Sequence, residues 1–151
     1  MPAWITITLA DLVDARVAEL IDACRREALG AGQGDPMLTI IPMVVDEVRR
    51  CIAFNPGTPL DATLTTIPAG LKELTVQKIV RLLKGRLQQP MTDDEVKAEA
   101  LYQKRLEQLT RGEWPVDKPD TALTTATVER GGATQIINSG RSLNSHALDG
   151  L

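Results

Sequence analysis

The side chains that most often carry out catalysis are scarce in this sequence and lie near its end. The only histidine is His146, and the first serine is Ser139. A histidine-based metal site and a serine–histidine nucleophile are therefore excluded from the main body of the chain. Neither of the common glycine-rich patterns that cradle phosphate groups is present. We expect a protein that is not an enzyme and that uses no cofactor and no metal ion.

Two further groups of residues could carry chemistry, and a structural role explains each of them. Cys24 and Cys51 are too few for a disulfide framework. Cys24 also lies on the apolar side of a predicted helix, where a small core residue is expected. The acidic run Asp93-Asp94-Glu95 directly follows a threonine, and acidic residues are favoured in the first turn of a helix. The run therefore predicts a helix start rather than a metal site.

A basic strip is the candidate binding surface in the helical part of the chain. It consists of Lys78, Arg81, Lys84 and Arg86, and Glu73 is the only acid in the same predicted helix. One interpretation is a solvated face of long side chains that cover apolar surface with their stems. The other is a surface that faces DNA in a channel or an acidic partner.

Length and charge narrow the class of protein. The chain has 151 residues, 43% of them apolar, and a formal net charge of −3. It has no apolar stretch of the ~20 residues that a membrane span needs, and its N-terminus lacks the layout of a signal peptide. We expect a soluble cytoplasmic protein that binds no membrane. The net acidity and the small number of aromatic residues argue against a dedicated nucleic-acid binder.

Apolar residues recur with a helical period in four segments, which predicts an all-α fold. The third segment is apolar over much of its circumference, so we place it at the centre of a four-helix bundle. Pro42 predicts a kink or a late start in the second helix. The loop from Phe54 to Thr66 is long, and it is either a binding loop or a solvated connection. The four helices are predicted to run from Thr8 to Ala28, from Asp35-Pro36 to Ile52, from Thr66-Ile67-Pro68 to Leu87, and from Thr92 to Leu109. Thr8 is the predicted cap of the first helix, with Asp11 in the reciprocal position. Thr92 and Glu95 are predicted to form a capping box at the start of the fourth helix, and Gly112 follows its end.

The composition changes after Trp114-Pro115, which we expect to lie back over the core. Residues 1–115 are therefore predicted to form a helical connector domain, and residues 116–151 an extended C-terminal arm rich in Thr, Gly and Ser. Strand-like stretches on either side of Gly131-Gly132 allow a β-hairpin in the arm. A two-stranded hairpin is only marginally stable alone, so the arm needs a partner chain to become ordered. Its candidate partner-binding residues are Val128, Ile136 and Ile137.

The order and spacing of several short motifs resemble a family of Mu-like neck proteins of tailed bacteriophages, the head–tail adaptor or head-completion family. The resemblance covers about Ile5 to Pro115 and, more weakly, the last residues of the chain. The motifs are Trp4-Ile5-Thr6-Ile7, Gly32-Gln33-Gly34-Asp35-Pro36, Asp46-Glu47-Val48-Arg49-Arg50, Ile67-Pro68-Ala69-Gly70-Leu71-Lys72, Leu82-Leu83-Lys84-Gly85-Arg86, Arg111-Gly112 and Leu148-Asp149-Gly150-Leu151.

The resemblance implies a structural virion protein located in the phage neck and assembled in the host cytoplasm. Such adaptors are small helical bundles that form a homo-oligomeric ring, here expected to be a dodecamer. The implied partners are the portal protein and a tail-side neck or tail-terminator protein. Genomic DNA would pass through the lumen of the ring without sequence-specific contacts.

Two other functions are partly compatible with this sequence. A small helical nucleic-acid-binding regulator would need a short helix-turn-helix pair with a basic recognition helix. Here a long loop separates the second and third predicted helices. A helical hydrolase would need clustered carboxylates, and no acidic pair lies outside a predicted helix cap.

Overall fold

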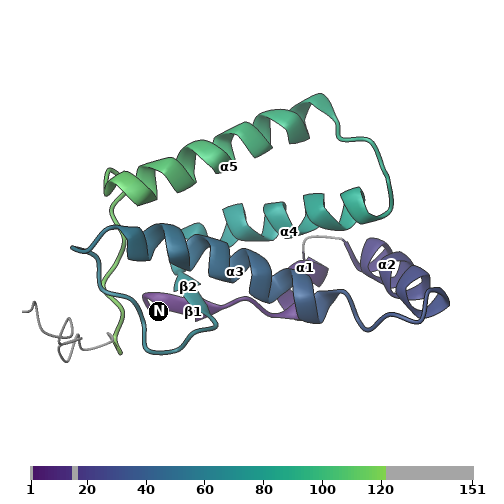
Figure 1. Ribbon diagram of the computed structural model, residues 1–151, viewed down its shortest axis with the longest axis horizontal. Coiled ribbons are helices and arrows are strands. Elements are labelled where there is room, and N and C mark those ends of the chain that lie inside the picture. Colours follow the sequence, from purple (N-terminus) through teal and green to yellow (C-terminus); the bar gives the residue numbers. More distant parts are fainter. Residues whose placement is uncertain (1, 15–16, 122–151) are drawn as a thin grey trace, which may run out of the picture.

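The computed structural model describes residues 2–14 and 17–121, which are mostly helical and contain one small antiparallel sheet (Figure 1). This confirms the all-α class. The elements in chain order are β1 (Trp4–Thr6), α1 (Leu9–Asp14), α2 (Ala18–Gly30), α3 (Met37–Phe54), β2 (Thr66–Pro68), a 3-10 turn η1 (Ala69–Leu71), α4 (Lys72–Arg86) and α5 (Asp93–Arg111).

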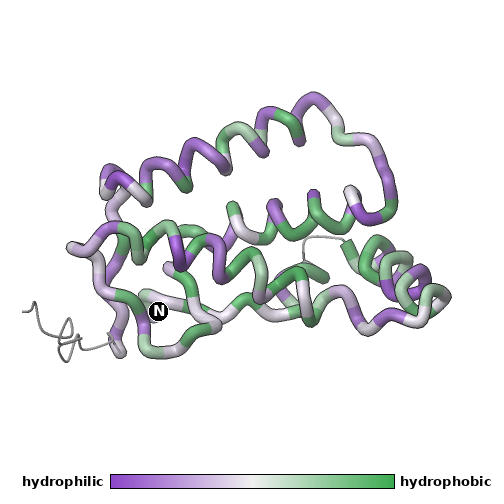
Figure 2. The backbone as a smooth tube through the Cα atoms, viewed as in Figure 1, coloured by the Kyte–Doolittle hydropathy of each residue, from purple (hydrophilic) through white to green (hydrophobic). Residues whose placement is uncertain are grey.

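The helix α4 is central, as its wide apolar arc predicted. It contacts α1, α2, α3 and α5, and Ile79 and Leu83 on it are fully buried. The core side chains come from every element between β1 and α5, so one continuous core joins the described helices. The outermost helix, α5, lies along α3 and α4 and is the most hydrophilic helix in Figure 2.

The prediction of one continuous first helix is wrong, because the structure contains two helices in this segment. α1 ends at Asp14 and α2 begins at Ala18. Leu12, Val17 and Ile21 are all buried, so the apolar period continues through the break and does not reveal it. Gly30 ends α2, as the glycine-rich run predicted.

The start of α1 is fixed by Asp11, which is tied to α4 as well. Its carboxylate accepts hydrogen bonds from the N–H and the hydroxyl of Thr8, at 2.8 and 2.7 Å. The predicted cap is thus formed by Asp11, while the Thr8 hydroxyl donates instead of accepting. Lys72 Nζ lies 2.5 Å from the other carboxylate oxygen. The bonds from Lys72 and Thr8 lower the pKa of Asp11 from 3.8 to about 2.

This ion pair predicts a stability change at acid pH. Because the pKa of Asp11 is depressed in the folded state, its stabilisation is complete above pH 3.8 and is lost as the pH falls through about 2. The shift corresponds to about 2 kcal/mol. We expect urea melts at pH 5, 4, 3 and 2 to show Asp11→Asn about 2 kcal/mol less stable than wild type at pH 5, with most of that difference gone at pH 2. A gap that stays constant with pH would contradict the assignment.

The start of the third predicted helix is also wrong, because Thr66–Pro68 is the strand β2. It pairs antiparallel with β1, and Ile5 lies opposite Ile67. The pairing joins segments about sixty residues apart, and no local sequence period reports such a partner. The helical turns begin only after Pro68, with η1 and then α4.

The ends of α3 agree with the sequence prediction, apart from the effect of its internal proline. An Asp35 carboxylate oxygen accepts a 2.9 Å hydrogen bond from the Met37 N–H, which caps the first turn. The helix begins at Met37, so Pro42 lies inside it and does not delay its start. The helix ends at Phe54, directly before Asn55.

Both ends of α5 are as predicted. Thr92 and Glu95 form the complete capping box. Gly112 follows the helix with a φ of 71°, in the left-handed region that favours glycine. A Cβ on Gly112 would lie 2.4 Å from the side-chain nitrogen of Asn55, so this glycine also lets the ends of α3 and α5 approach closely.

Candidate docking surface

The structure places the predicted basic strip against the acidic residues of α5. Lys78 Nζ lies 2.5 Å from one carboxylate oxygen of Glu99, and Arg81 Nε lies 2.9 Å from the other. Lys84 pairs with Glu95, one turn earlier on α5. The acidic surface that these three cations meet therefore belongs to the same chain.

The burial of the strip excludes both interpretations for two of its four residues. The side chains of Lys78 and Arg81 are only 13% and 6% exposed. Both the solvated face and the face toward DNA or a partner are therefore wrong for this pair. Lys84 and Arg86 are half-buried, and Arg86 donates a hydrogen bond to the side-chain oxygen of Gln33.

A buried tyrosine completes the contact between α4 and α5. The Tyr102 hydroxyl donates a 2.7 Å hydrogen bond to Glu47 on α3, and its ring lies under Lys78 Nζ and the Arg81 guanidinium, at 5.0 and 5.9 Å. Burial, together with Glu47, raises the pKa of Tyr102. Burial also opposes ionisation of Glu99, but its hydrogen bonds outweigh that effect and lower its pKa. These polar groups hold three helices together.

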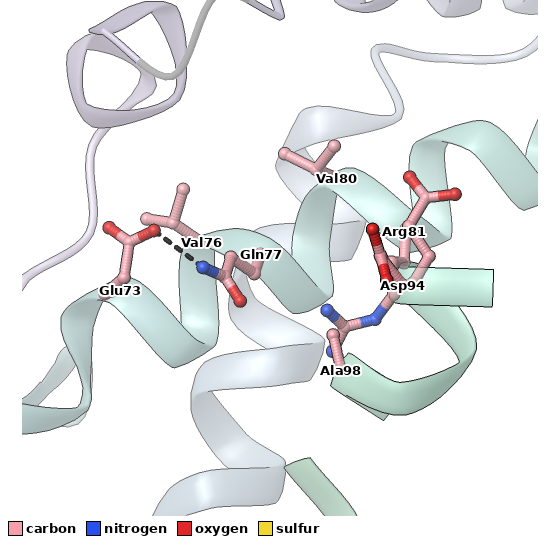
Figure 3. Close-up of a pocket in the computed structure, with 8 residues that line it drawn as sticks. Glu73, Val76, Gln77, Val80, Arg81, Asp94 and Ala98 are labelled. Atoms are coloured by element: carbon pink, nitrogen blue, oxygen red, sulfur yellow. Dashed lines mark hydrogen bonds between the residues drawn. The ribbon is translucent and has the colours of Figure 1, made fainter. Parts of the chain in front are cut away.

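A pocket of about 400 Å³ opens beside this network, between α4 and the start of α5 (Figure 3). Glu73 and Gln77 lie on its α4 side, joined by a 2.8 Å hydrogen bond, and Asp94 and Ala98 lie on its α5 side. Arg81, the cation that lines it, is already paired with an α5 carboxylate. The pocket is therefore an opening between packed helices whose central charge is neutralised.

An apolar groove of about 440 Å³ runs along the first half of α3. We call it the α3 groove. Leu38 and Leu64 line it and are 77% and 75% exposed, although both are large apolar side chains. Contiguous exposed apolar surface is typical of contact sites between proteins. Its main apolar lining residues are Ile7, Leu38, Ile41, Pro42, Val45 and Leu64.

A buried arginine positions the loop that carries Leu64. Arg49 on α3 is 6% exposed and donates hydrogen bonds to the backbone oxygens of Thr66 and Asp61, at 2.7 and 2.8 Å. Its guanidinium also lies 5.5 Å from the centre of the Trp4 ring. The loop before β2 is thereby fixed at two points, so Leu64 stands on a held segment of chain.

The last described residues are joined to this same region. Thr121 donates a side-chain hydrogen bond to the Asp61 carboxylate, and its backbone oxygen accepts from the Ala62 N–H at 2.8 Å. The Trp4 indole N–H donates to the backbone oxygen of Asp117, also at 2.8 Å. We call these contacts the Asp61 clasp, because they join the first strand, the loop before β2 and the C-terminal segment.

The Asp61 carboxylate is nearly buried yet remains ionised. Burial raises its pKa, but hydrogen bonds from Thr121, Thr66 and the backbone N–H groups of Thr63 and Ala62 outweigh that effect and lower it. A charged acceptor makes stronger hydrogen bonds than a neutral one. The clasp is therefore held by charge-assisted bonds.

The packed chain continues past Pro115, the boundary predicted between the helical domain and the arm. Trp114 packs against the core, as expected for the chain just before the boundary, but Val116 in the predicted arm packs there as well, and the contacts extend to Thr121. The expectation that the chain from Val116 onward needs a partner is therefore wrong for residues 116–121. The predicted hairpin, with Val128, Ile136 and Ile137, lies outside the described residues.

The two cysteines are unpaired, and Cys24 is buried, as predicted. Among residues 2–14 and 17–121, no group of three or more His, Cys, Asp or Glu side chains is placed to hold a metal ion. None of the helices described is long and apolar enough to cross a membrane.

Comparison with protein-family models, with curated proteins and with solved structures found no match to this chain.

The α3 groove was not predicted from the sequence. Leu38 lies within the second predicted helix, at a position that continues its apolar pattern, but the structure leaves it on the surface. A signal was present, because apolar residues at neighbouring positions give α3 more apolar surface than one buried face can use. Leu64 gave a second signal, since a leucine between one alanine and three threonines has no helical or strand period to explain it.

Proposed function

We propose that this chain is a structural virion protein of a tailed phage, a neck adaptor assembled in the host cytoplasm. Copies of the chain form a ring, a dodecamer, which joins the portal protein to a tail-side neck or tail-terminator protein. The ring continues the channel through which genomic DNA passes, without sequence-specific contacts. The fold proposed for this role is a four-helix adaptor-type bundle with an extended C-terminal arm.

The observation that carries this proposal is the α3 groove with its two exposed leucines. A small helical domain that keeps so much apolar surface open is suited to contact another protein. The resemblance in the order of the sequence motifs supplies the identity of that contact. The main alternative, a nucleic-acid-binding regulator, has less support, because Lys78 and Arg81 are neutralised by Glu99.

The proposal predicts rings that depend on the α3 groove. The purified full chain, alone and mixed with the portal protein, should form rings visible by negative-stain microscopy and by mass photometry. Leu38→Glu and Leu64→Glu should both weaken assembly. Burial of one leucine contributes about 1.5–3 kcal/mol, so its loss from each contact should weaken association by about tenfold or more.

Leu29→Glu is the matched control, because Leu29 is 74% exposed but lies on α2, outside the groove. It should assemble like wild type. A full chain that stays monomeric at every concentration, with and without the portal protein, would contradict the adaptor function. Rings that tolerate both groove substitutions would remove the groove from the contact.

A further inference from the structure

The described chain ends beside the loop that forms one wall of the α3 groove. The last hydrogen bonds join Thr121 to Asp61 and Ala62. Leu64, which lines the groove, follows Ala62 by two residues. The chain beyond Thr121 therefore starts next to the groove, on a segment that the Asp61 clasp holds in place.

The next residues are long enough to enter the groove. Thirty residues follow Thr121, since the chain has 151. An extended chain advances about 3.3 Å per residue, so Leu123 lies within about 7 Å of Thr121. Residues 122–128 span about 23 Å when extended, which is about the length of fifteen residues of helix. The segment is therefore long enough to run along the first half of α3.

The chemistry of the segment matches the groove. Residues 122–128 read Ala-Leu-Thr-Thr-Ala-Thr-Val and carry no charge. Asp46 is the one charged side chain among the described residues that line the groove. An uncharged segment with one leucine can fill an apolar groove without burying an unpaired charge, which would be costly.

We infer that residues 122–128 occupy the α3 groove of their own chain, with the side chain of Leu123 against Leu38 and Leu64. The free protein then covers its own apolar surface, and a partner that docks in the groove has to displace this segment. The inference concerns the free chain, so it stands apart from the proposed ring and can fail independently of it.

The test measures how fast a thiol in the groove reacts. The full chain carries Leu38→Cys as the reporter and Cys51→Ser to remove the half-buried native thiol, while buried Cys24 is kept. Labelling by a maleimide is compared with and without Leu123→Glu, because a carboxylate is disfavoured in the groove. We expect Leu123→Glu to speed labelling of the reporter several-fold, at a rate independent of protein concentration.

A reporter at Leu29→Cys is the matched control, since Leu29 is equally exposed but lies outside the groove. Its labelling rate should not respond to Leu123→Glu. Thermal melts of all variants should coincide, which shows that the rates report the groove and not unfolding. The inference is overturned if labelling at the Leu38→Cys reporter is unchanged, if the Leu29→Cys control responds equally, or if protection appears only as the protein concentration rises.

Discussion

Leu83→Asp is expected to unfold the domain. Leu83 is fully buried on α4, and its backbone oxygen accepts a hydrogen bond from the buried Cys24 thiol. A carboxylate there would be buried within the apolar core. Such a change costs about 4 kcal/mol or more, which is a large part of the about 5–15 kcal/mol that stabilises an ordinary domain. A circular-dichroism melt should show a transition lowered by tens of degrees, or none.

Leu38→Asp makes the same chemical change at a position that is 77% exposed. Its melting temperature should stay within a few degrees of wild type, because an aspartate is also favoured in the first turn of a helix. If Leu83→Asp melted like wild type, α4 would not be the centre of the core.

Glu99→Gln should also destabilise the domain, by a smaller amount than Leu83→Asp. Lys78 and Arg81 share the Glu99 carboxylate, and the substitution leaves both cations without it in a mostly buried place. Breaking a fully buried ion pair costs about 3–5 kcal/mol. Because the Glu99 side chain is 28% exposed, we expect a smaller loss of about 2 kcal/mol. Urea denaturation at neutral pH measures it.

Asp94→Asn is the matched control for the charge removed. Asp94 lies on the same helix, 3.6 Å from Lys97, but its side chain is 94% exposed. An exposed pair of this kind contributes about 0–1 kcal/mol, so the free energy of unfolding should hardly change. Equal losses from the two substitutions would mean that burial of the Glu99 pairs adds nothing to stability.

The features set by local chemistry were predictable from the sequence. Thr92, Glu95 and Gly112 act within one turn of the backbone, and their capping roles are confirmed. The wide apolar arc of α4 predicted its central place because such a helix must pack on several sides. These predictions needed no knowledge of which segments meet.

The features that depend on distant partners were not predictable in this way. β1 and β2 become strands by pairing with each other, and neither has an internal signal strong enough to override the helix expected after Thr66. The basic strip was counted along α4 alone, whereas Glu99, which neutralises Lys78 and Arg81, lies on α5. The charge of one helix face says little until the facing helix is known.

The candidate site was the part least accessible from the sequence. The α3 groove arises where Ile7, Leu38 and Leu64 come together from three separate segments. The loop that carries Leu64 is held by the buried Arg49, which the sequence predicted only as part of a motif in a helix. Buried polar side chains that bind backbone oxygens look like surface residues in a sequence.

The Asp61 clasp also determines how the domain would bear a mechanical load. A pull on the chain beyond Thr121 does not act first on the end of α5. It acts on Asp61, and from there through Arg49 and Trp4 on α3 and on the sheet. Tension applied to the C-terminal segment is thus transmitted to the contact between β1 and α3, in the middle of the molecule. We expect α5 to unwind only after that contact has broken.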